Sequence, residues 1–474
     1  MVNVYSFRGG VRISAEKNTI ECRTETLPVP SVLKVRVGSI GACVSVGDHV
    51  LRGQIIGDTD NPDLCPVRSP AEGDVTGIDA DASGAVSVTV AVSGGNSADP
   101  SIRPFDKKLS QAATAEIVEK VREAGVTGSG KDAGPVHVKI RDAAGKVKRV
   151  IVDCTGNDPF ITVNEHLAAE NAAGIINGIK IVMRALGVER AVIAVDENNV
   201  GAVNSLREKI GSGKYIKVAA MKRKYPQGDG RNLVRAVLGR DLPAGKSPVD
   251  AGCAVFNAET CVHIFRALAE GEPMTEKYMT VDGDCVKRPG NLLVPAGTAV
   301  SELFAFCGGL KKEPARIVAG GAVNGTDGYS PETAVDCTVD GVLAFSEAYS
   351  SVGGRYACIR CGRCVSACPE HLLPFELFRL TVKGKKDKAV KIGLECCTEC
   401  GACAYVCPGK LPLVGMIRDA KNGLTGSCEE EMCKPCADTE ADAHTGDANG
   451  NPEITKEITG DAARSSEESD HETE

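Results

Sequence analysis

The sequence predicts a multidomain chain of the α/β class, and three observations support this prediction. Residues 1–100 alternate apolar and polar side chains between Gly, Asp and Pro turns, which is typical of short β-strands. Residues 149–221 alternate apolar strands with stretches of helical periodicity, which indicates a parallel sheet covered by helices. Residues 350–420 contain two regularly spaced runs of cysteine. We therefore expect a β-rich domain (1–100), an α/β domain (101–275), a second β-rich segment (276–349) and a cysteine-rich domain (350–420).

Length and composition limit the functions that the chain can have. Its 474 residues suffice for several domains, and no stretch reaches the roughly 18 apolar residues of a membrane span. The first ten residues lack the basic and apolar regions of a signal peptide. Without an export signal, 21 cysteines indicate a reducing cytoplasm and not a disulfide framework. Trp is absent and aromatic residues make up 4%, so we expect no nucleic-acid partner.

The last 38 residues differ in composition from the rest. Residues 437–474 contain twelve Asp or Glu and two Lys or Arg, a net charge of −10, which leaves the preceding part at +2. Few large apolar residues occur there, so the segment is predicted to be a disordered acidic tail. A solubilising role is the simpler interpretation, and a role in docking is the alternative.

The N-terminal β region carries two turn motifs. V-G-D-x-V-L-x-G-Q-x-I-G (residues 46–57) and S-P-A-E-G-D-V (residues 69–75) resemble those of biotinyl- and lipoyl-type barrel-sandwich domains. The lysine that such domains modify is missing from the tip. We therefore interpret this region as a scaffold and not as a carrier.

The middle of the chain has the pattern of a parallel α/β domain. Helical periodicity at 112–125 precedes an apolar strand at 149–154, a long helix at 165–186 and a strand at 191–196. A helix at 202–210 and a strand at 216–221 follow, and a strand-rich segment with Gly turns occupies about 283–345.

The cysteine-rich domain repeats one spacing. Each run reads C-x2-C-x2-C-x3-C-P, the spacing of proteins that hold two [4Fe–4S] clusters, in which the fourth Cys of each run ligates the other cluster. The sets predicted on this basis are Cys358, Cys361, Cys364 and Cys407 for cluster 1, and Cys397, Cys400, Cys403 and Cys368 for cluster 2.

Zinc ribbons and disulfides are the alternatives to this assignment. A zinc site needs two well-separated CxxC pairs, which does not match three Cys plus a Cys-Pro, twice. Cys396 lies beside a predicted ligand and is interpreted as a spare thiol, whereas Cys428, Cys433 and Cys436 are interpreted as incidental or accessory thiols.

Two loops of the α/β domain could bind a phosphate or a nucleotide. The Gly-rich segment that contains Gly128 and Gly130 can present bare backbone N–H groups to a phosphate, and Lys139 adds a positive charge. Such segments are also commonly plain turns. Tyr225 follows a strand, at the end where α/β sheets bind ligands, but an ordinary βα loop would fit this position as well.

Taken in order, the motifs of the chain resemble those of one family. F-R-G-G, R-E-A-G-x-x-G-x-G, P-x-H-V-K, K-Y-P-Q-G, S-E-L-x-x-F-C-G-G and both cysteine runs resemble the C subunit of the Rnf complex, over roughly residues 6–420. That family is the peripheral electron-entry subunit of membrane-bound ferredoxin:NAD⁺ oxidoreductases that pump Na⁺ or H⁺. The resemblance implies integral-membrane and peripheral partner subunits, other redox partner proteins, and a place on the cytoplasmic side of the membrane.

The resemblance also implies cofactors and a further domain type. The α/β region is similar to the NADH- and FMN-binding subunit of respiratory complex I, so Gly128, Gly130, Lys139 and Tyr225 are the candidate FMN and NAD(H) residues, and residues 276–349 are expected to be SLBB-like. The family loop G-x-G-G-A-x-F-P-T reads here G-S-G-K-D-A-G-P-V. Lys131 and Asp132 replace small residues where a phosphate would approach the backbone. We therefore expect FMN binding to be weaker than in relatives with the small-residue loop.

Two other functions remain open at this point. One is a soluble relative of the same architecture that feeds a dedicated reductase, such as the electron-transfer protein associated with proline reductase. The other is a non-redox scaffold whose clusters are structural. Reversible bleaching of visible absorbance on reduction would exclude the scaffold.

Overall fold

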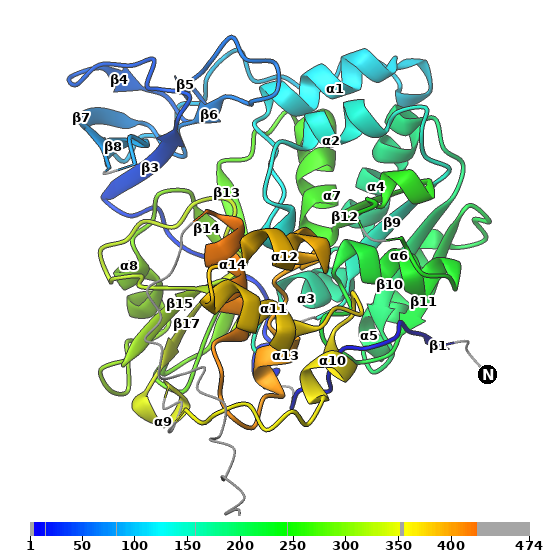
Figure 1. Ribbon diagram of the computed structural model, residues 1–474. Coiled ribbons are helices and arrows are strands. Elements are labelled where there is room, and N and C mark those ends of the chain that lie inside the picture. Colours follow the sequence, from blue (N-terminus) through cyan, green and yellow to red (C-terminus); the bar gives the residue numbers. More distant parts are fainter. Residues whose placement is uncertain are drawn as a thin grey trace, which may run out of the picture. The chain divides into compact units, whose positions relative to one another are not determined.

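A computed structural model describes residues 4–423, apart from residues 15, 82, 157, 244 and 351–354 and the side chains of Lys131 and Ser350 (Figure 1). The predicted tail and Cys428, Cys433 and Cys436 lie outside the described residues. No helix in the described part of the chain has the length and apolar character that crossing a membrane requires.

The N-terminal β domain is an antiparallel sheet with a short hairpin beside it. The sheet has the order β3-β8-β7-β4, and β5 pairs with β6. In β3 every second side chain is buried, because Leu33, Val35 and Val37 face the core while their neighbours face solvent. The bounds are β3 Val32–Gly38, β4 His49–Val50, β5 Ile55–Gly57, β6 Val67–Arg68, β7 Gly73–Ala80 and β8 Val86–Val92.

The α/β domain is built on a five-stranded parallel sheet with the order β1-β11-β10-β9-β12. Alternate residues of each strand enter two cores: Val150 and Val152 of β9 pack with α1, α2, α4 and α7, whereas Ile151 packs with α6 on the other face. The strands are β1 Val4–Tyr5, β9 Arg149–Cys154, β10 Ala191–Asp196, β11 Ile216–Met221 and β12 Cys253–Asn257. The helices are α1 Thr114–Glu123, α2 Val136–Ala143, α3 Val163–Glu170, α4 Ala172–Leu186, α5 Val200–Ile210, α6 Gly230–Leu238 and α7 Ala258–Phe265.

The structure has two helices, α3 and α4, where one long helix was predicted at 165–186, so that prediction was wrong. The chain breaks at Asn171, whose backbone (φ −123°, ψ 43°) is not helical. The Asn171 side chain accepts a hydrogen bond of 3.1 Å from the backbone N–H of Gly174 and so caps the start of α4. Apolar periodicity continues across the break, and for this reason the pattern alone did not reveal it.

The second β-rich segment forms a six-stranded sheet with β2 (Glu25–Thr26) of the N-terminal segment. The order is β16-β15-β17-β13-β14-β2, and the sheet packs against α8. Its elements are β13 Glu276–Asp282, β14 Gly290–Pro295, α8 Val300–Phe306, β15 Arg316–Ala319, β16 Thr326–Asp327 and β17 Gly341–Phe345. Helix α9 (Glu347–Ser350) follows.

The cysteine-rich domain consists of two similar helix pairs with a helix between them. Its helices are α10 Arg363–Ala367, α11 Pro374–Val382, α12 Lys386–Lys391, α13 Ala402–Tyr405 and α14 Leu413–Lys421. Helix α10 packs against α13, and α11 packs against α14, so the two halves face each other.

The described N-terminal segment, from β1 to β2, connects several of these parts. β1 adds to the edge of the parallel sheet beside β11, and β2 (Glu25–Thr26) pairs with β14 of the second β-rich segment. Between them, the Gly10 N–H donates to the Ala367 carbonyl of the cysteine-rich domain at 2.9 Å. The N-terminal segment therefore contacts three domains before it enters the β3 sheet.

Candidate functional site

The two cysteine runs fold into loops with the same backbone. Arg360 and Glu399 stand two residues after the first Cys of their runs, and both have φ 54°. His371 (φ 57°) and Lys410 (φ 52°) stand three residues after the fourth Cys of each run. Left-handed backbone at non-glycine residues is uncommon, so its recurrence at equivalent positions shows that the two loops are structural repeats.

The thiols of the repeats gather around two cavities. One is lined by Cys358, Cys361, Cys364 and Cys407, and the other by Cys368, Cys397, Cys400 and Cys403. Each cavity thus combines three thiols from one run with the fourth thiol of the other run. Among the described residues, no group of three or more His, Cys, Asp or Glu is close enough together to hold a single metal ion.

The donor set in each cavity fits an iron–sulfur cluster. Cys thiolates are the usual ligands of [4Fe–4S] clusters, with four for each cluster. Burial raises the pKa of Cys368 to about 11 and that of Cys403 still further. A thiolate there therefore needs a compensating positive charge, which bound iron would supply.

The surroundings of the two cavities differ. Cys358 and Cys361 are exposed, whereas Cys368, Cys400 and Cys403 are buried. The loop of the second set is held by the rest of the protein: the Tyr225 hydroxyl donates to the Cys400 carbonyl, and Lys421 Nζ donates to the Cys397 carbonyl at 3.0 Å. The first cavity therefore opens to solvent, and the second lies against the α/β domain.

A buried ion-pair cluster ties Cys368 to the α/β domain. Glu370 follows Cys368-Pro369, and its side chain is 3% exposed. Both nitrogen branches of the Arg235 guanidinium donate to Glu370 at 2.8 Å, and Arg231 donates to it at 2.9 and 3.1 Å. Burial alone would raise the pKa of Glu370, but the two arginines hold this pKa below its ordinary value. Helix α6 therefore fixes the segment that positions the fourth thiol of the second set.

A cleft of ≈ 770 Å³ lies beside this second loop. Its lining includes Asp153 and Asn257, from the carboxyl ends of β9 and β12, together with Thr398 and Glu399. β9 leads to β10 and β11 on one side while β12 lies on the other, so the cleft is at the topological switch point of the sheet, where α/β domains bind ligands.

The charge of the cleft is negative. Among the described residues its lining has seven carboxylates and two arginines: Asp132, Asp153, Asp158, Glu165, Asp229, Asp340 and Glu399, with Arg231 and Arg418. Burial, with added repulsion from Asp132 and Asp340, raises the pKa of Asp153 to about 7. An anionic ligand would be repelled at this edge of the cleft.

The Gly-rich loop contributes Gly130 to the cleft, but its N–H groups are largely used within the protein. The Gly128 N–H donates to the Gly134 carbonyl and the Gly130 N–H to the Thr338 carbonyl, both at 2.8 Å. The Asp132 N–H donates to the Ser129 carbonyl at 3.1 Å. Lys139 lies outside the cleft lining, 3.0 Å from the Asp132 carboxylate. The residues present therefore do not fit a bound FMN phosphate.

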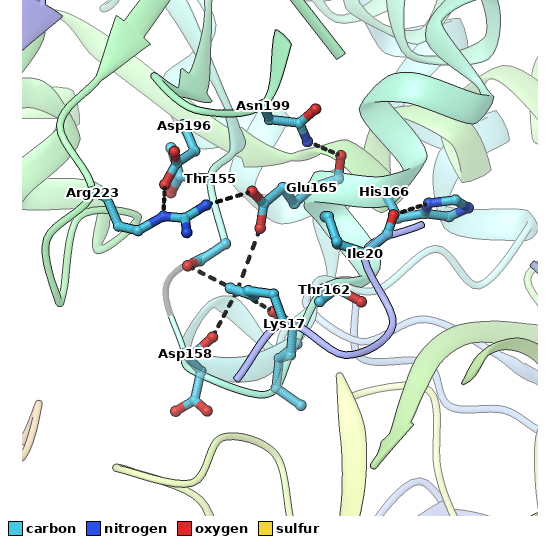
Figure 2. A network of polar contacts seen from close by, with 12 residues as sticks. Lys17, Ile20, Thr155, Asp158, Thr162, Glu165, His166, Asp196, Asn199 and Arg223 are labelled. Carbon is cyan, nitrogen blue, oxygen red and sulfur yellow. Dashed lines mark hydrogen bonds and ion pairs between the residues drawn. The ribbon is translucent and has the colours of Figure 1, made fainter. Parts of the chain in front are cut away.

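A second polar network fills the ends of β9, β10 and β11 (Figure 2). Lys17 Nζ donates to the carbonyls of Gly156, Asp158 and Ile161 at 3.1, 2.8 and 2.7 Å, and lies 3.4 Å from Glu165. Burial lowers the pKa of Lys17 and raises that of Glu165, and the attraction between the two charges opposes both shifts. A lysine of the N-terminal segment thus supports the loop after β9 from inside the protein.

Arg223 extends this network to the next strand. It lies 2.8 Å from Asp196 at the end of β10 and 3.6 Å from Glu165 (Figure 2). Two cations of this chain, Lys17 and Arg223, therefore lie beside the buried Glu165 carboxylate.

The structure brings some of the sequence-predicted residues together and separates others. All eight predicted cysteines line the two cavities, and Gly130 and Tyr225 both line the cleft. Gly128 and Lys139 are not part of that lining. Tyr225 is 3% exposed, and its hydroxyl contacts the loop of the second cysteine set.

Sequence reasoning missed the buried charged residues that support the loop after β9 and the segment after Cys368. Lys17, Arg231, Arg235 and Glu370 carry no motif of their own. Only the place of Glu370, directly after Cys-Pro, could have drawn attention to it. The arginine pair follows the K-Y-P-Q-G loop at helical spacing, and a four-residue spacing of two cations is also common on solvated helix faces.

Comparisons with known proteins match each domain to a family. Residues 5–93 match the RnfC barrel sandwich hybrid domain and residues 121–266 the Nuo51 FMN-binding domain. Residues 278–327 match the SLBB domain and residues 357–410 the 4Fe-4S dicluster domain. The predicted fold class is confirmed by these matches, and the chain carries a 4Fe-4S dicluster domain.

Known relatives are similar along most of the chain. The C subunit of the ion-translocating oxidoreductase complex of Rhodobacter capsulatus is 35% identical over 89% of this chain and 83% of its own length. The C subunit of the Na(+)-translocating ferredoxin:NAD(+) oxidoreductase complex of Acetobacterium woodii is 32% identical, over 80% of this chain and 87% of its own. The proton-translocating counterpart of Clostridium ljungdahlii is also 32% identical, over 81% and 85%.

A solved structure gives a weaker likeness. A chain of an NAD+-reducing [NiFe]-hydrogenase superposes with a TM-score of 0.46 and 17% identity, over 59% of this chain and 54% of its own. The relatives from ion-translocating complexes, by contrast, match at 32–35% identity over most of both lengths. The chain belongs to the RnfC family, the C subunits of Rnf-type ion-translocating oxidoreductase complexes.

Proposed function

We propose that this chain is a peripheral electron-transfer subunit of an Rnf-type complex that couples electron transfer between ferredoxin and NAD to ion translocation. The relatives named above are subunits of such complexes. The observation that carries the proposal is the pair of cavities, each lined by three thiols of one run and the fourth of the other.

The ligand sets are part of this proposal. Cys358, Cys361, Cys364 and Cys407 hold cluster 1, and Cys397, Cys400, Cys403 and Cys368 hold cluster 2. A bound [4Fe–4S] cluster supplies one-electron redox chemistry, and its potential depends on the hydrogen bonds and solvent exposure around it. The residues of this chain supply the positions and the surroundings. Tyr225 holds the loop of Cys400. Arg231 and Arg235 hold Glu370, which follows Cys368-Pro369, so both contacts support the second cavity. Cys358 and Cys361 of the first cavity are exposed.

The test of electron transfer is spectroscopic. Protein purified without oxygen is reduced with dithionite and reoxidised while its visible absorbance is recorded. We expect the broad visible absorbance of iron–sulfur clusters, which should decrease on reduction and return on oxidation. An absorbance that stays unchanged would show that any bound iron is structural.

Partners and location are tested by membrane fractionation. The described residues contain no helix suited to crossing a membrane, so attachment is expected to depend on partner subunits on the cytoplasmic face. Washing membranes with a chaotrope should release the protein, and detergent should release it together with integral subunits. A protein found wholly in the soluble fraction would instead favour the electron-transfer protein of a dedicated reductase.

FMN and NAD(H) are the remaining cofactors implied by the domain match at residues 121–266. Because the loop N–H groups are used internally and Asp132 neutralises Lys139, we expect the purified protein to contain well under one FMN per chain. Replacing Lys131 and Asp132 by Gly should raise flavin content, and adding Lys139→Ala should lower it again. Stoichiometric FMN in the native protein, unchanged by both substitutions, would show that the flavin binds elsewhere.

A further inference from the structure

We propose that the face around the first cysteine loop is a docking surface for a small acidic protein that carries a one-electron redox group. The face is defined by residues 355–364 and 407–410. The inference rests on the proposed function, because it takes the cavity lined by Cys358, Cys361, Cys364 and Cys407 as a redox centre.

The middle of this face is apolar and exposed. Residues 355–361 are all exposed, and among them Tyr356 and Ile359 have exposed fractions of 67% and 68%. Ile359 lines the thiol cavity itself, and the Tyr356 N–H donates to the Gly409 carbonyl at 3.0 Å, which joins the two segments of the face. Large apolar side chains exposed beside a redox centre are typical of a protein interface.

The rim of the face is positive. Its two segments contain Arg355, Arg360, Arg363 and Lys410 and no acidic residue. Arg360 lines the cavity, and Arg363 and Lys410 are each next in the chain to a lining residue. None of Arg360, Arg363 and Lys410 forms an ion pair with any residue that the structure describes. An acidic partner would therefore meet three cations that can pair with it.

The second thiol cavity provides an internal comparison, because each position around the first cavity has an equivalent around the second. The position of Arg360 is taken there by Glu399, which pairs with Arg418 at 2.9 Å and Lys421 at 2.8 Å. The positions of Arg363 and Lys410 are taken by Ala402 and His371. The backbone that surrounds a thiol cavity therefore does not require cations, and their presence at the exposed loop alone fits recognition of an acidic protein.

Transient complexes between redox proteins have small interfaces, and electrostatic attraction steers their association. The apolar centre would exclude water on contact, and the cations would orient the partner before contact. No covalent step is involved.

The test uses residues that already stand around the second cavity. The repeat-swap variant R360E/R363A/K410H gives the first cavity the residue types of Glu399, Ala402 and His371. The backbone permits this, because Arg360 and Glu399 share φ 54°, and Lys410 and His371 have φ 52° and 57°. The matched control K385E/K386A/K388A removes the same amount of positive charge from exposed lysines at and near α12. The probe is a small acidic dicluster ferredoxin, and its affinity for the full chain is measured by calorimetry at low and high salt.

The expected result is that the repeat-swap variant weakens binding about tenfold at low salt, whereas the control changes it less than about twofold. Ile359→Thr, which again introduces the residue of the second repeat, should weaken binding at both salt concentrations. Equal weakening by the control, or affinity that does not depend on salt, would overturn the proposal. Self-association of the chain in place of ferredoxin binding, seen by light scattering, would do so as well.

Iron content and reduced-state EPR are recorded for every variant. These measurements distinguish a failure of the docking proposal from a failure of the proposed function. Native protein without iron would contradict the proposed function, whereas unchanged iron with unchanged ferredoxin affinity in the repeat-swap variant would contradict the docking surface alone.

Discussion

The two cysteine loops share a backbone and differ in their surroundings. Both have φ 54° at the residue two positions after their first cysteine, and both end in Cys-Pro before a nine-residue helix. The first loop is exposed and positively charged around Cys358 and Cys361, and the second is buried at Cys400, where Tyr225 contacts it. Cysteine spacing therefore determines the geometry of each loop, residues between the cysteines determine its charge, and contacts with distant residues determine its exposure.

The fourth cysteine of each run gives the largest expected effect. In Cys368→Ala the buried set loses a ligand, and in Cys407→Ala the exposed set loses one. Each variant should fall from about eight to about four iron atoms per chain. The iron that remains should be chelated rapidly in Cys368→Ala, because it lies in the exposed cavity, and slowly in Cys407→Ala.

One outcome would contradict the exchange of the fourth cysteine between the two clusters. If the iron that remains in Cys368→Ala is chelated slowly, each run holds its own cluster.

The buried ion-pair cluster of Arg231, Arg235 and Glu370 supports Cys368, which belongs to the thiol set of the second cavity. Replacing both Arg231 and Arg235 by Met leaves Glu370 buried without its partners, which should lower the free energy of unfolding by about 3–5 kcal/mol. Replacing Glu370 by Met as well should recover part of this loss, because no unpaired charge remains. Denaturant unfolding measures both. Arg363→Met on the first loop is the control and should change stability by less than about 0.5 kcal/mol.

A pair of equivalent glycines makes the same comparison at the backbone. Gly362 has φ 74° and open space around the position of a Cβ, whereas Gly401 has φ 84° and would place a Cβ 2.8 Å from the Val323 carbonyl oxygen. Substitution by Ala costs about 1–2 kcal/mol of backbone strain at either position. Gly401→Ala should cost more than Gly362→Ala by thermal or denaturant unfolding. Equal losses would show that the second loop is not confined by the neighbouring domain.

The hydroxyl of Tyr225 should have the smallest effect. Tyr225→Phe leaves the Cys400 carbonyl without this donor and should cost about 1 kcal/mol. The EPR spectrum of the second cluster should change, and that of the first should not. A change in both spectra would mean that the two loops are not independent.

The sequence predicted the parts of the molecule that depend on local pattern. The cysteine spacing indicated both thiol sets, and alternation in residues 149–221 indicated three of the five parallel strands, β9, β10 and β11, and the helical segments between them. The break at Asn171 was missed because its apolar stripe continues into α4. Apolar periodicity indicates which face of a helix is buried, but it does not indicate whether the helical backbone is continuous.

Long-range contacts could not be predicted in this way. Lys17 and the loop after β9 are more than a hundred residues apart, and nothing in the surrounding residues indicates that a lysine would be buried there. The pairing of β1 with β11 involves only two residues of each strand, too few for a pattern. The use of the Gly-rich loop N–H groups by Gly134 and Thr338 also depends on tertiary structure.

The central claim is that the two thiol sets hold two separate four-iron clusters. Iron and acid-labile sulfide in anaerobically purified native protein, with integrated EPR of the dithionite-reduced state, test it most directly. The account predicts about eight iron and eight sulfide per chain, and two reducible centres whose signals show mutual coupling. About four iron with one reducible centre, or zinc in place of iron, would contradict it.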